Sequence, residues 1–395
     1  MTHFRNSLHA ILLGFLIIMG EVQMAETTNA ADGVQDYLVY VGTYTRGNKS
    51  KGIYTLKLNI KTGALTEVGT TGGVVNPSFV AIHPSGKFLY AVGEISEFGG
   101  KPTGGVTAFA INPKDGGLTK LNEKSSGGAG PCYLVVDATG KNVLVANYGG
   151  GSVACLPINA DGTLKDASSF IQHEGSSVNA QRQSGPHGHS INLSLDNKFA
   201  FAADLGLDKV LIYAFDAEKG QLTPHTPAAA EIKPGSGPRH FAFHPSGEYA
   251  YVINEMALTV TAFKYDAQLG TLKTLQTIST IPDADRSQPG LSTAEVRVHP
   301  SGKFLYGSNR GHDTIAAFRI NQDTGELTYI ENEPTQGKTP RNFFIDPSGT
   351  YLLAENQATD SIVVFRINQD TGELEPTGNR IEIPAPVCIR MIPAP

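Results

Sequence analysis

Two short stretches of the sequence bring together side chains that can carry charge and move protons. Gly-Pro-His-Gly-His-Ser holds His187 and His189 between glycines, and Gly-Pro-Arg-His holds Arg239. A later Asn-Glu pair supplies Glu255. Arginine binds carboxylate or phosphate through parallel hydrogen bonds, and a neighbouring Glu or His can take a proton from water. A cation beside an attacked carbonyl stabilises the developing oxyanion, so these residue types suit acyl chemistry on a small anionic molecule.

Both stretches belong to a sequence motif that repeats roughly every fifty residues, a period typical of propeller blades. Each copy has a short hydrophobic run, a tight turn such as His-Pro-Ser-Gly and an alternating strand, as in NPSFVAIHPSGKFLYAVGE from Asn76. Between the copies lie two more strands joined by an Asp/Asn-Gly type turn. Such four-stranded units cannot bury both faces alone and must stack radially. The repeated turns fall at His83, Asp137, Ser194, His244, His299 and Asp346.

Six full copies and two terminal fragments predict an all-β fold, a seven-bladed β-propeller of four-stranded antiparallel blades over residues 37–395. The N-terminal fragment, which begins YLVYVGTYT, resembles the second, third and fourth strands of a blade. The C-terminal PAPVCIRMI resembles a first strand. We therefore expect the two ends to complete one blade, which closes the ring and removes free sheet edges. The absence of tryptophan argues against WD40 repeats and Trp-docking quinoprotein propellers.

Aligning the repeats with one another gives two rows of equivalent positions. Both rows are expected at one mouth of the central channel, because the first strand of each blade lines that channel. The row at the start of the first strand is chemically diverse: Ser78, Cys132, His189, Arg239, Ala294, Arg341 and Val387. The row at the end of the second strand reads Glu94, Tyr148, Leu205, Glu255, Arg310 and Gln357. Positions that do not repeat are the candidates for function. We expect a site that gathers His187, His189, Arg239, Glu255, Arg310, Arg341 and Glu94, with Arg297 deeper in the channel.

Positions that do repeat are expected to be structural. His83, His244 and His299 belong to the tight turn. A row of Asn and Asp residues just before the second mouth row should bond the backbone of the next corner. Cys132 and Cys155 fall two strands apart, near 10 Å at about 4.8 Å per strand, which is too far for a disulfide. Those two cysteines and Cys388 therefore read as small buried apolar residues.

Structural alternatives also exist for the candidate site residues. Arg239 and Glu255 could form a structural ion pair, each channel His could be a packed residue, and Arg310 could be a solvated charge on the rim. The His-x-His spacing of GPHGHS would point both rings the same way, as metal ligands can, but no third ligand follows at a suitable spacing. No P-loop, dinucleotide fingerprint or Gly-x-Ser-x-Gly elbow is present. We therefore expect neither a metal nor an organic cofactor.

Composition and the N-terminal residues bear on partners and compartment. The net charge is −6 and no basic run occurs, so we expect no nucleic-acid partner. Arg5 precedes an apolar run at residues 10–19 that is too short to span a bilayer. Residues 1–30 are interpreted as a signal peptide and short linker, with cleavage near Ala25 or Ala30; an uncleaved anchor is the alternative. We expect a periplasmic or secreted monomer with no stable membrane insertion after cleavage.

Several of these phrases resemble the lactonase family of seven-bladed propellers, which includes the cycloisomerase-type 6-phosphogluconolactonases and the fungal 3-carboxy-cis,cis-muconate lactonizing enzyme. The resemblance covers about residues 37–392 and rests on YVGTYT, GPHGHS, ADLGLDKVLIY, GPRHFAFHPSG and AEVRVHPSGKFLYGSNRG. It implies lactone-ring chemistry without metal or organic cofactor, at a His, two Arg and a Glu. Carried over by position, these fall on His187 or His189, Arg239, Arg297 and Glu255.

The leading hypothesis is a lactone-ring hydrolase resembling 6-phosphogluconolactonase, acting on a small anionic lactone or carboxylated substrate. Arg239 and Arg297 would hold the anionic group or polarise the carbonyl, while Glu255, alone or with a His, would activate water. The alternatives are a non-catalytic propeller that binds a cell-envelope partner and a muconate-type lactonizing cycloisomerase. A sugar phosphate belongs in the cytoplasm, so the predicted signal peptide leaves open whether the substrate is phosphorylated.

Overall fold

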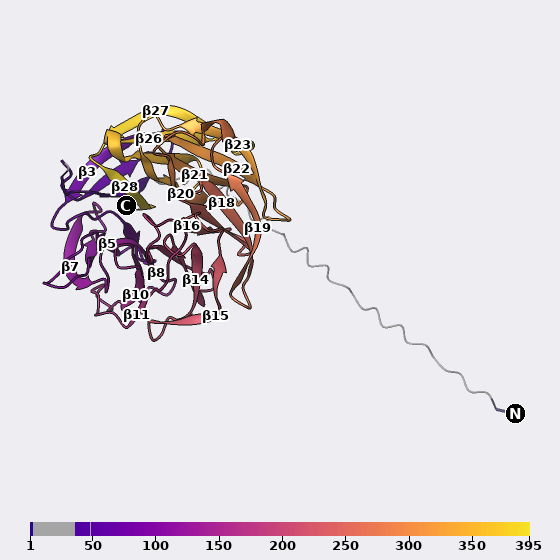
Figure 1. Cartoon of the computed structure of the whole chain (residues 1–395), viewed down its shortest axis with the longest axis horizontal. Helices are drawn as coiled ribbons and strands as arrows, with labels where there is room; N and C mark the ends of the chain where they lie inside the picture. Colours follow the sequence, from indigo (N-terminus) through magenta and orange to yellow (C-terminus); the bar gives the residue numbers. More distant parts are fainter. Residues whose placement is uncertain (3–35, 48) are drawn as a thin grey trace. The chain divides into compact units, whose positions relative to one another are not determined.

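The computed structural model describes residues 1–2, 36–47 and 49–395. Residues 36–395 form seven four-stranded antiparallel sheets arranged in a ring (Figure 1), which confirms the predicted propeller. The predicted signal peptide and linker, residues 1–30, lie outside the described residues apart from the first two. Among the described residues, no helix has the length and apolar character needed to cross a membrane.

Each blade runs outward from the channel in four strands, and Figure 1 shows the fourth strands around the rim. The first, innermost strands are β4 (Val80–Ile82), β8 (Pro131–Val136), β12 (Gly188–Leu193), β16 (Pro238–Phe243), β20 (Ser292–Val298), β24 (Pro340–Ile345) and β28 (Pro386–Pro393). The second strands are β1 (Tyr37–Thr43), β5 (Phe88–Gly93), β9 (Asn142–Asn147), β13 (Phe199–Asp204), β17 (Tyr249–Asn254), β21 (Phe304–Arg310) and β25 (Tyr351–Asn356).

The outer half of each blade completes the sheet. The third strands are β2 (Ile53–Leu58), β6 (Gly105–Ile111), β10 (Ser152–Pro157), β14 (Lys209–Asp216), β18 (Thr259–Asp266), β22 (Thr314–Ile320) and β26 (Ser361–Ile367). The fourth strands are β3 (Leu65–Thr71), β7 (Leu118–Ser125), β11 (Ser169–Gln172), β15 (Gln221–Glu231), β19 (Thr271–Ser279), β23 (Leu327–Pro334) and β27 (Leu374–Glu382). Two single-turn 3₁₀ helices, η1 (Asp283–Asp285) and η2 (Gln357–Thr359), lie in connections.

The ring closes through its two ends, as predicted. β28 pairs antiparallel with β1 in a register that runs from Tyr37 opposite Pro393 to Thr43 opposite Pro386. The backbone amide of Ala394 extends this ladder by donating to the carbonyl of Asp36 at 2.7 Å. The split blade therefore has its innermost strand from the C-terminus and its other three from the N-terminus.

The repeated histidines join neighbouring blades. His83, His244 and His299 each share a hydrogen bond between Nδ1 and the hydroxyl of the turn serine two residues later. Their Nε2 atoms lie 2.9, 2.9 and 2.8 Å from carbonyl oxygens in the next blade. These carbonyls belong to turn glycines, Gly140, Gly302 and Gly349. The predicted structural role of the turn histidines is confirmed.

A second repeated contact comes from buried tyrosines on the second strands. The hydroxyls of Tyr40, Tyr90, Tyr251 and Tyr306 each donate to a glycine carbonyl of the following blade at 2.8–3.0 Å. The last of these acceptors, Gly372, has φ of 83°, and a Cβ there would lie 2.4 Å from the Phe304 ring. Glycine is therefore required both by the backbone conformation and by the close packing of adjacent blades.

The cysteines and the Asn/Asp row show where the sequence-based expectations held. Cys132 on β8, Cys155 on β10 and Cys388 on β28 are buried and unpaired, as expected. Asp204 accepts from the amides of its own corner, which confirms the prediction for that position. For three asparagines of this row the prediction of a bond to the next corner's backbone was wrong. Their side-chain amides donate instead to buried backbone carbonyls in the segment that leads from the previous blade into their own. These pairs are Asn147 with Ser126, Asn309 with Thr280 and Asn356 with Thr335.

Deleting residues 386–395 should damage the whole ring, because it exposes β1 as an unpaired edge and uncovers the apolar faces beside it. We expect the truncated protein to be insoluble or to melt far below the full chain by circular dichroism. A circular permutant that joins residue 395 to residue 36 and opens the exposed Gly72–Gly73 loop keeps every strand, and it should melt near the wild type. Equal melting of the truncated and full-length proteins would contradict this dependence on closure.

Candidate active site

One small cavity of about 10 Å³, close to the size of a single water, lies where the innermost strands begin. It is lined by six of the seven residues of the first predicted row: Ser78, Cys132, His189, Arg239, Arg341 and Val387. Glu94, from the second row, also lines it, together with Tyr44 and His240. The residues at the non-repeating positions therefore lie close together around one cavity, as predicted. Its cause is topological, because every first strand starts at this mouth and every second strand ends there.

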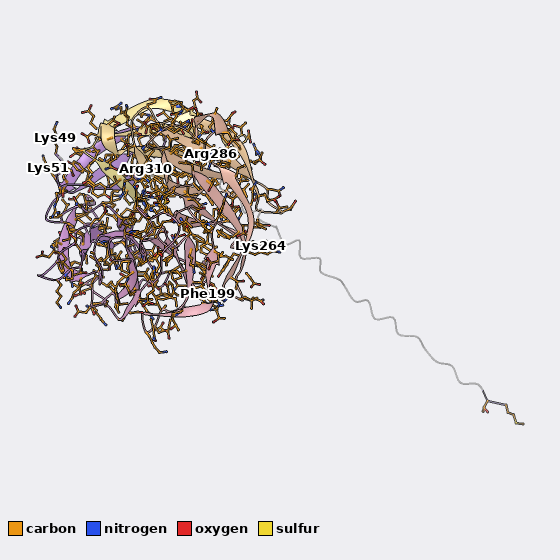
Figure 2. All side chains as sticks on the ribbon, viewed as in Figure 1. Lys49, Lys51, Phe199, Lys264, Arg286 and Arg310 are labelled. Carbon is orange, nitrogen blue, oxygen red and sulfur yellow. The ribbon has the colours of Figure 1, made fainter. Side chains whose placement is uncertain are left out.

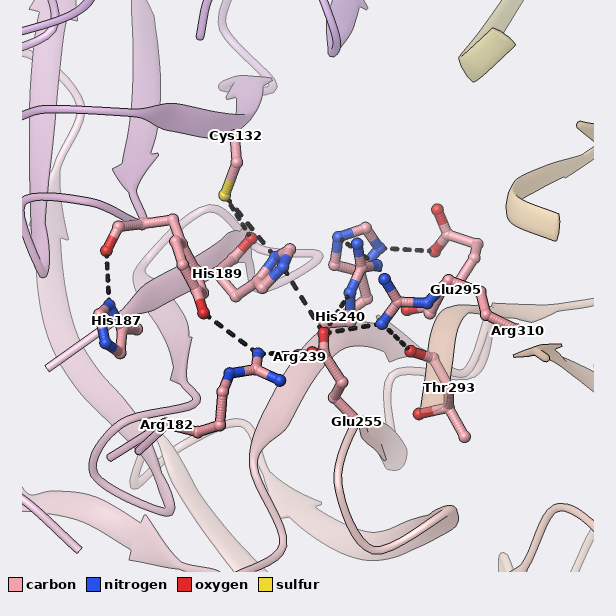
Figure 3. Close-up of polar contacts among 12 residues, drawn as sticks. Cys132, Arg182, His187, His189, Arg239, His240, Glu255, Thr293, Glu295 and Arg310 are labelled. Carbon is pink, nitrogen blue, oxygen red and sulfur yellow. Dashed lines mark hydrogen bonds and ion pairs between the residues drawn. The ribbon is translucent and has the colours of Figure 1, made fainter. Parts of the chain in front are cut away.

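Glu255 is the centre of an arginine cluster beside this cavity (Figure 3). Its Oε1 accepts a hydrogen bond from Arg182 Nη2 at 2.7 Å. Its Oε2 accepts from Arg239 Nε at 3.0 Å and lies 3.0 Å from Arg310 Nη2. Arg239 is only 2% exposed and Glu255 only 5%. The predicted neighbour relation of Arg239 and Glu255 is thus confirmed, and one carboxylate pairs with the largely buried Arg239 and Arg310 and with the exposed Arg182.

The electrostatic setting of Glu255 limits what this carboxylate can do. Burial acts to raise its pKa, but the charges of Arg310 and Arg239 and the hydrogen bond from Arg182 lower the pKa to about 2. A carboxylate of such low basicity, with both oxygens already bonded, is a poor acceptor for a proton from water. Its geometry suits it to hold the guanidinium groups in place.

The two histidines of GPHGHS lie in different settings. His189 lines the cavity, with Nε2 4.0 Å from Glu255 Oε2 and Nδ1 3.6 Å from Cys132 Sγ. Burial, followed by the charges of Arg239 and its neighbours, holds the pKa of His189 well below its usual value. His187 instead stacks on Tyr148, and its Nδ1 lies 3.0 Å from the carbonyl oxygen of that residue. His189 is therefore the member of the pair placed beside Glu255.

Arg341 differs from the other guanidinium groups of the cavity. Its Cζ lies 5.4 Å from the centre of the Tyr44 ring. Within the described part of the chain, no residue forms a hydrogen bond or an ion pair with it. Arg341 is half-buried and has no anionic partner among the described residues, so a bound carboxylate or oxyanion would match its planar donor fork. Arg341 is thus the guanidinium that the fold leaves available to a ligand.

Arg310 and Glu94 are both held firmly. Arg310 donates from Nη2 to the carbonyl of Thr293 at 2.7 Å, and its Nε is buried without a hydrogen-bond partner among the described residues. Burial is the main reason that its pKa falls to about 9. The Arg310 side chain is only 13% exposed, so it is not a solvated rim charge; Figure 2 labels it inward of Lys49 and Lys51. Glu94 accepts at Oε2 from the hydroxyls of Tyr44, at 2.8 Å, and of Ser78.

Arg297 lies deeper along β20, as predicted, and away from Glu255. Its Nε donates to the carbonyl of Phe343 at 2.7 Å, and its Nη2 lies 3.4 Å from Glu295 Oε2. Its Cζ lies 4.6 Å from the centre of the Phe344 ring. It lines a different cavity, which it shares with Glu295. The His, Glu and two Arg carried over from the family resemblance therefore do not all meet, and a catalytic role for Arg297 stays a prediction.

Two site residues were not found from the sequence. Tyr44 directly follows β1, at the position of the split blade that corresponds to Glu94 and Tyr148. Completing the second row for the terminal fragment would have found it. Arg182 lies in the long connection between β11 and β12, where no repeat exists to align. Within the described ranges, no group of three or more His, Cys, Asp or Glu residues is arranged to hold a metal ion.

Comparisons with known proteins agree with this fold. Residues 38–391 match the family described as "Lactonase, 7-bladed beta-propeller". The 6-phosphogluconolactonase of Bacillus subtilis (strain 168) is 38% identical over 312 residues, which cover 78% of this chain and 85% of that protein. The 6-phosphogluconolactonase of Formosa agariphila is 35% identical over 78% of this chain and 86% of its own length.

A solved structure is similarly close. The Pseudomonas aeruginosa periplasmic gluconolactonase PpgL superposes with a TM-score of 0.85 and 31% identity, covering 91% of this chain and 100% of that one. The fold and site define an all-β enzyme built on a closed ring, and the chain belongs to the lactonase family of seven-bladed β-propellers. It is a lactone hydrolase, as the leading hypothesis from the sequence held.

Replacing Glu255 with Gln should destabilise the fold, because Arg239 and Arg310 then lose their buried counter-charge. Removing one partner of a buried ion pair costs about 3–5 kcal/mol. The folded state lowers the pKa of Glu255 from 4.5 to about 2, so its stabilisation is complete above the unfolded value and is lost as pH falls toward 2. Urea unfolding should show the wild-type advantage over Glu255→Gln at pH 7 shrinking at about pH 3.

The exposed Glu97→Gln variant is the control for this measurement. It should match the wild type at both pH values, because a solvated carboxylate gains little from folding. A free-energy difference between wild type and Glu255→Gln that does not change with pH would contradict the ion-pair account.

Proposed function

We propose that this lactonase hydrolyses the ring ester of an unphosphorylated sugar lactone outside the cytoplasm, and that Arg341 binds the group on which negative charge develops. The reaction adds one water to the lactone carbonyl and releases an open-chain hydroxy acid. The observation that carries the proposal is the guanidinium of Arg341, which lines the cavity at the channel mouth and has no hydrogen bond or ion pair with any described residue.

The charge balance of the cavity supports an anionic transition state and product. Four guanidinium groups gather at the mouth, from Arg182, Arg239, Arg310 and Arg341, against the two carboxylates of Glu94 and Glu255. Three of the four are engaged by Glu255. Since a tetrahedral oxyanion and a carboxylate each carry one negative charge, the excess positive charge favours both over the neutral ester.

Some of these guanidinium groups are fixed by Glu255, whereas Arg341 is available to bind a ligand. Glu255 holds Arg239 and Arg310 in a preorganised field, so no reorganisation is needed when the oxyanion forms. Arg341 supplies the donors that contact the oxyanion itself. His189, kept neutral by burial and by the neighbouring cations, can orient the lactone by a hydrogen bond.

The choice of an unphosphorylated substrate rests on two supports. The N-terminal residues read as a signal peptide, and sugar phosphates are cytoplasmic metabolites. The Pseudomonas aeruginosa relative, 31% identical, is described as a periplasmic gluconolactonase. Glucono-1,5-lactone is therefore the first substrate to test, with its 6-phosphate as the comparison.

Arg341→Ala should lower kcat/KM for glucono-1,5-lactone by about 10²–10³-fold, the cost of losing one oxyanion donor. Acid release above the spontaneous rate, followed with a pH indicator, measures the effect. Arg366→Ala is the matched control, because Arg366 also stacks on a tyrosine, Tyr351, but is exposed. Wild-type activity in Arg341→Ala would refute the assignment, and a higher kcat/KM for the 6-phosphate would refute the substrate choice.

Expression of the full chain in a Gram-negative host should place the protein in the periplasmic fraction. The mature N-terminus, read by Edman sequencing, should begin after Ala25 or Ala30, because small residues there suit signal cleavage. A protein found in the cytoplasm with its first residues intact would contradict export.

A further inference from the structure

We propose that Glu94 is the general base of the hydrolysis, and that Tyr44 and Ser78 hold its carboxylate toward the water that attacks the lactone. This assignment rests on the proposed function, because it names the group that activates water at the same site. It replaces Glu255, which the sequence favoured for that step.

The geometry of the Glu94 carboxylate is that of a base with one oxygen held and one free. Oε2 accepts from Tyr44 at 2.8 Å and from the Ser78 hydroxyl, and both donors line the cavity. Oε1 accepts no hydrogen bond from any residue in the described part of the ring. Glu94 is half-buried, and Oε1 is not enclosed by protein atoms. A water in the cavity can therefore reach Oε1.

The other candidate bases are less suited to the step. Both oxygens of Glu255 are occupied by guanidinium groups, and its pKa of about 2 leaves little drive for proton transfer. His189 is neutral, but the neighbouring cations that keep it neutral also oppose its protonation. In contrast, the hydroxyl donors on Glu94 carry no charge, and Arg341 lies near the carboxylate without bonding it.

The backbone around Glu94 is fixed by Asn76, so the base is positioned by the fold. The Glu94 amide donates to the Asn76 carbonyl at 3.0 Å, and Asn76 Nδ2 donates to the Glu94 carbonyl at 3.2 Å. Asn76 Oδ1 also accepts from the amides of Thr45 and Arg46, at 3.0 and 2.9 Å. One side chain thereby ties Glu94 to the segment that carries Tyr44, across the boundary between the split blade and the next.

The chemistry balances without a further reactant. As the water oxygen bonds to the lactone carbonyl carbon, Glu94 Oε1 takes one water proton, and the carbonyl electron pair moves to the oxyanion facing Arg341. Collapse of this intermediate re-forms the C=O bond and breaks the bond to the ring oxygen. The ring oxygen leaves with the proton held by Glu94, which restores the carboxylate. The new carboxylic acid then loses its proton to solvent.

The test compares Glu94→Gln with Glu97→Gln, an exposed neighbour in the same loop, in the full chain with glucono-1,5-lactone. We expect Glu94→Gln to lower kcat by about 10²–10⁴-fold with little change in KM. Glu97→Gln should behave as the wild type. Glu94→Asp, which shortens the base, is the second variant and should lower kcat if Glu94→Gln does not fold.

Chemical rescue separates a base from a structural carboxylate. In Glu94→Ala, formate or azide should occupy the vacated space and restore kcat at least about tenfold, because a small anion can take the water proton. Ser78→Ala should keep kcat within about tenfold of wild type, since it removes only one hydrogen bond. A much larger loss in Ser78→Ala, with Glu94→Ala not rescued, would instead indicate a serine nucleophile and overturn the proposal.

These experiments separate failure of the proposed function from failure of the assignment of Glu94 as the base. If wild-type protein hydrolyses neither glucono-1,5-lactone nor its 6-phosphate, the proposed function fails. If it hydrolyses one of them while Glu94→Gln, or Glu94→Asp in its place, keeps kcat within about tenfold, only the base assignment fails.

Discussion

Hydrogen bonds between β28 and β1 join the two ends of the chain into one blade, and the rest of the structure depends on that pairing. Each sheet is apolar on both faces and can be covered only by its two neighbours, so an open ring would leave two uncovered faces and a free edge. Closure also has a local effect on the site. It brings Tyr44, which follows β1, beside Glu94 of the next blade, and it completes the cavity wall with Val387.

Within the closed ring, repeated and non-repeated residues have separate tasks. Turn histidines and buried tyrosines bond the glycine carbonyls of the next blade and fix the spacing between blades. Residues at the channel mouth do not make these contacts between blades, so their types can differ from blade to blade. There, Glu255 holds Arg239, Arg182 and Arg310, while Arg341 is left without a bonded partner among the described residues. A rigid ring thus supports a preorganised cationic site, which suits stabilisation of an oxyanion.

The repeat made the fold predictable, because the period, the turn phrase and the two terminal fragments each require the same closed ring. Alignment of the copies also predicted the cavity wall, including His189 and Arg239. It could not predict Arg182, which comes from an unrepeated connection, or the amide partners of the Asn row, which depend on linker carbonyls that only the folded chain brings near. The weak basicity of Glu255 was likewise hidden, since it results from three cations that are distant in sequence.

The central claim is that Arg341 is the guanidinium reserved for the charge that lactone opening creates. A crystal structure of the protein with gluconate, the product of glucono-1,5-lactone hydrolysis, tests this most directly. The account predicts the product carboxylate in the channel mouth, with an oxygen about 2.7–3.2 Å from the guanidinium nitrogens of Arg341. Gluconate bound elsewhere, with Arg341 turned away from the cavity, would contradict it.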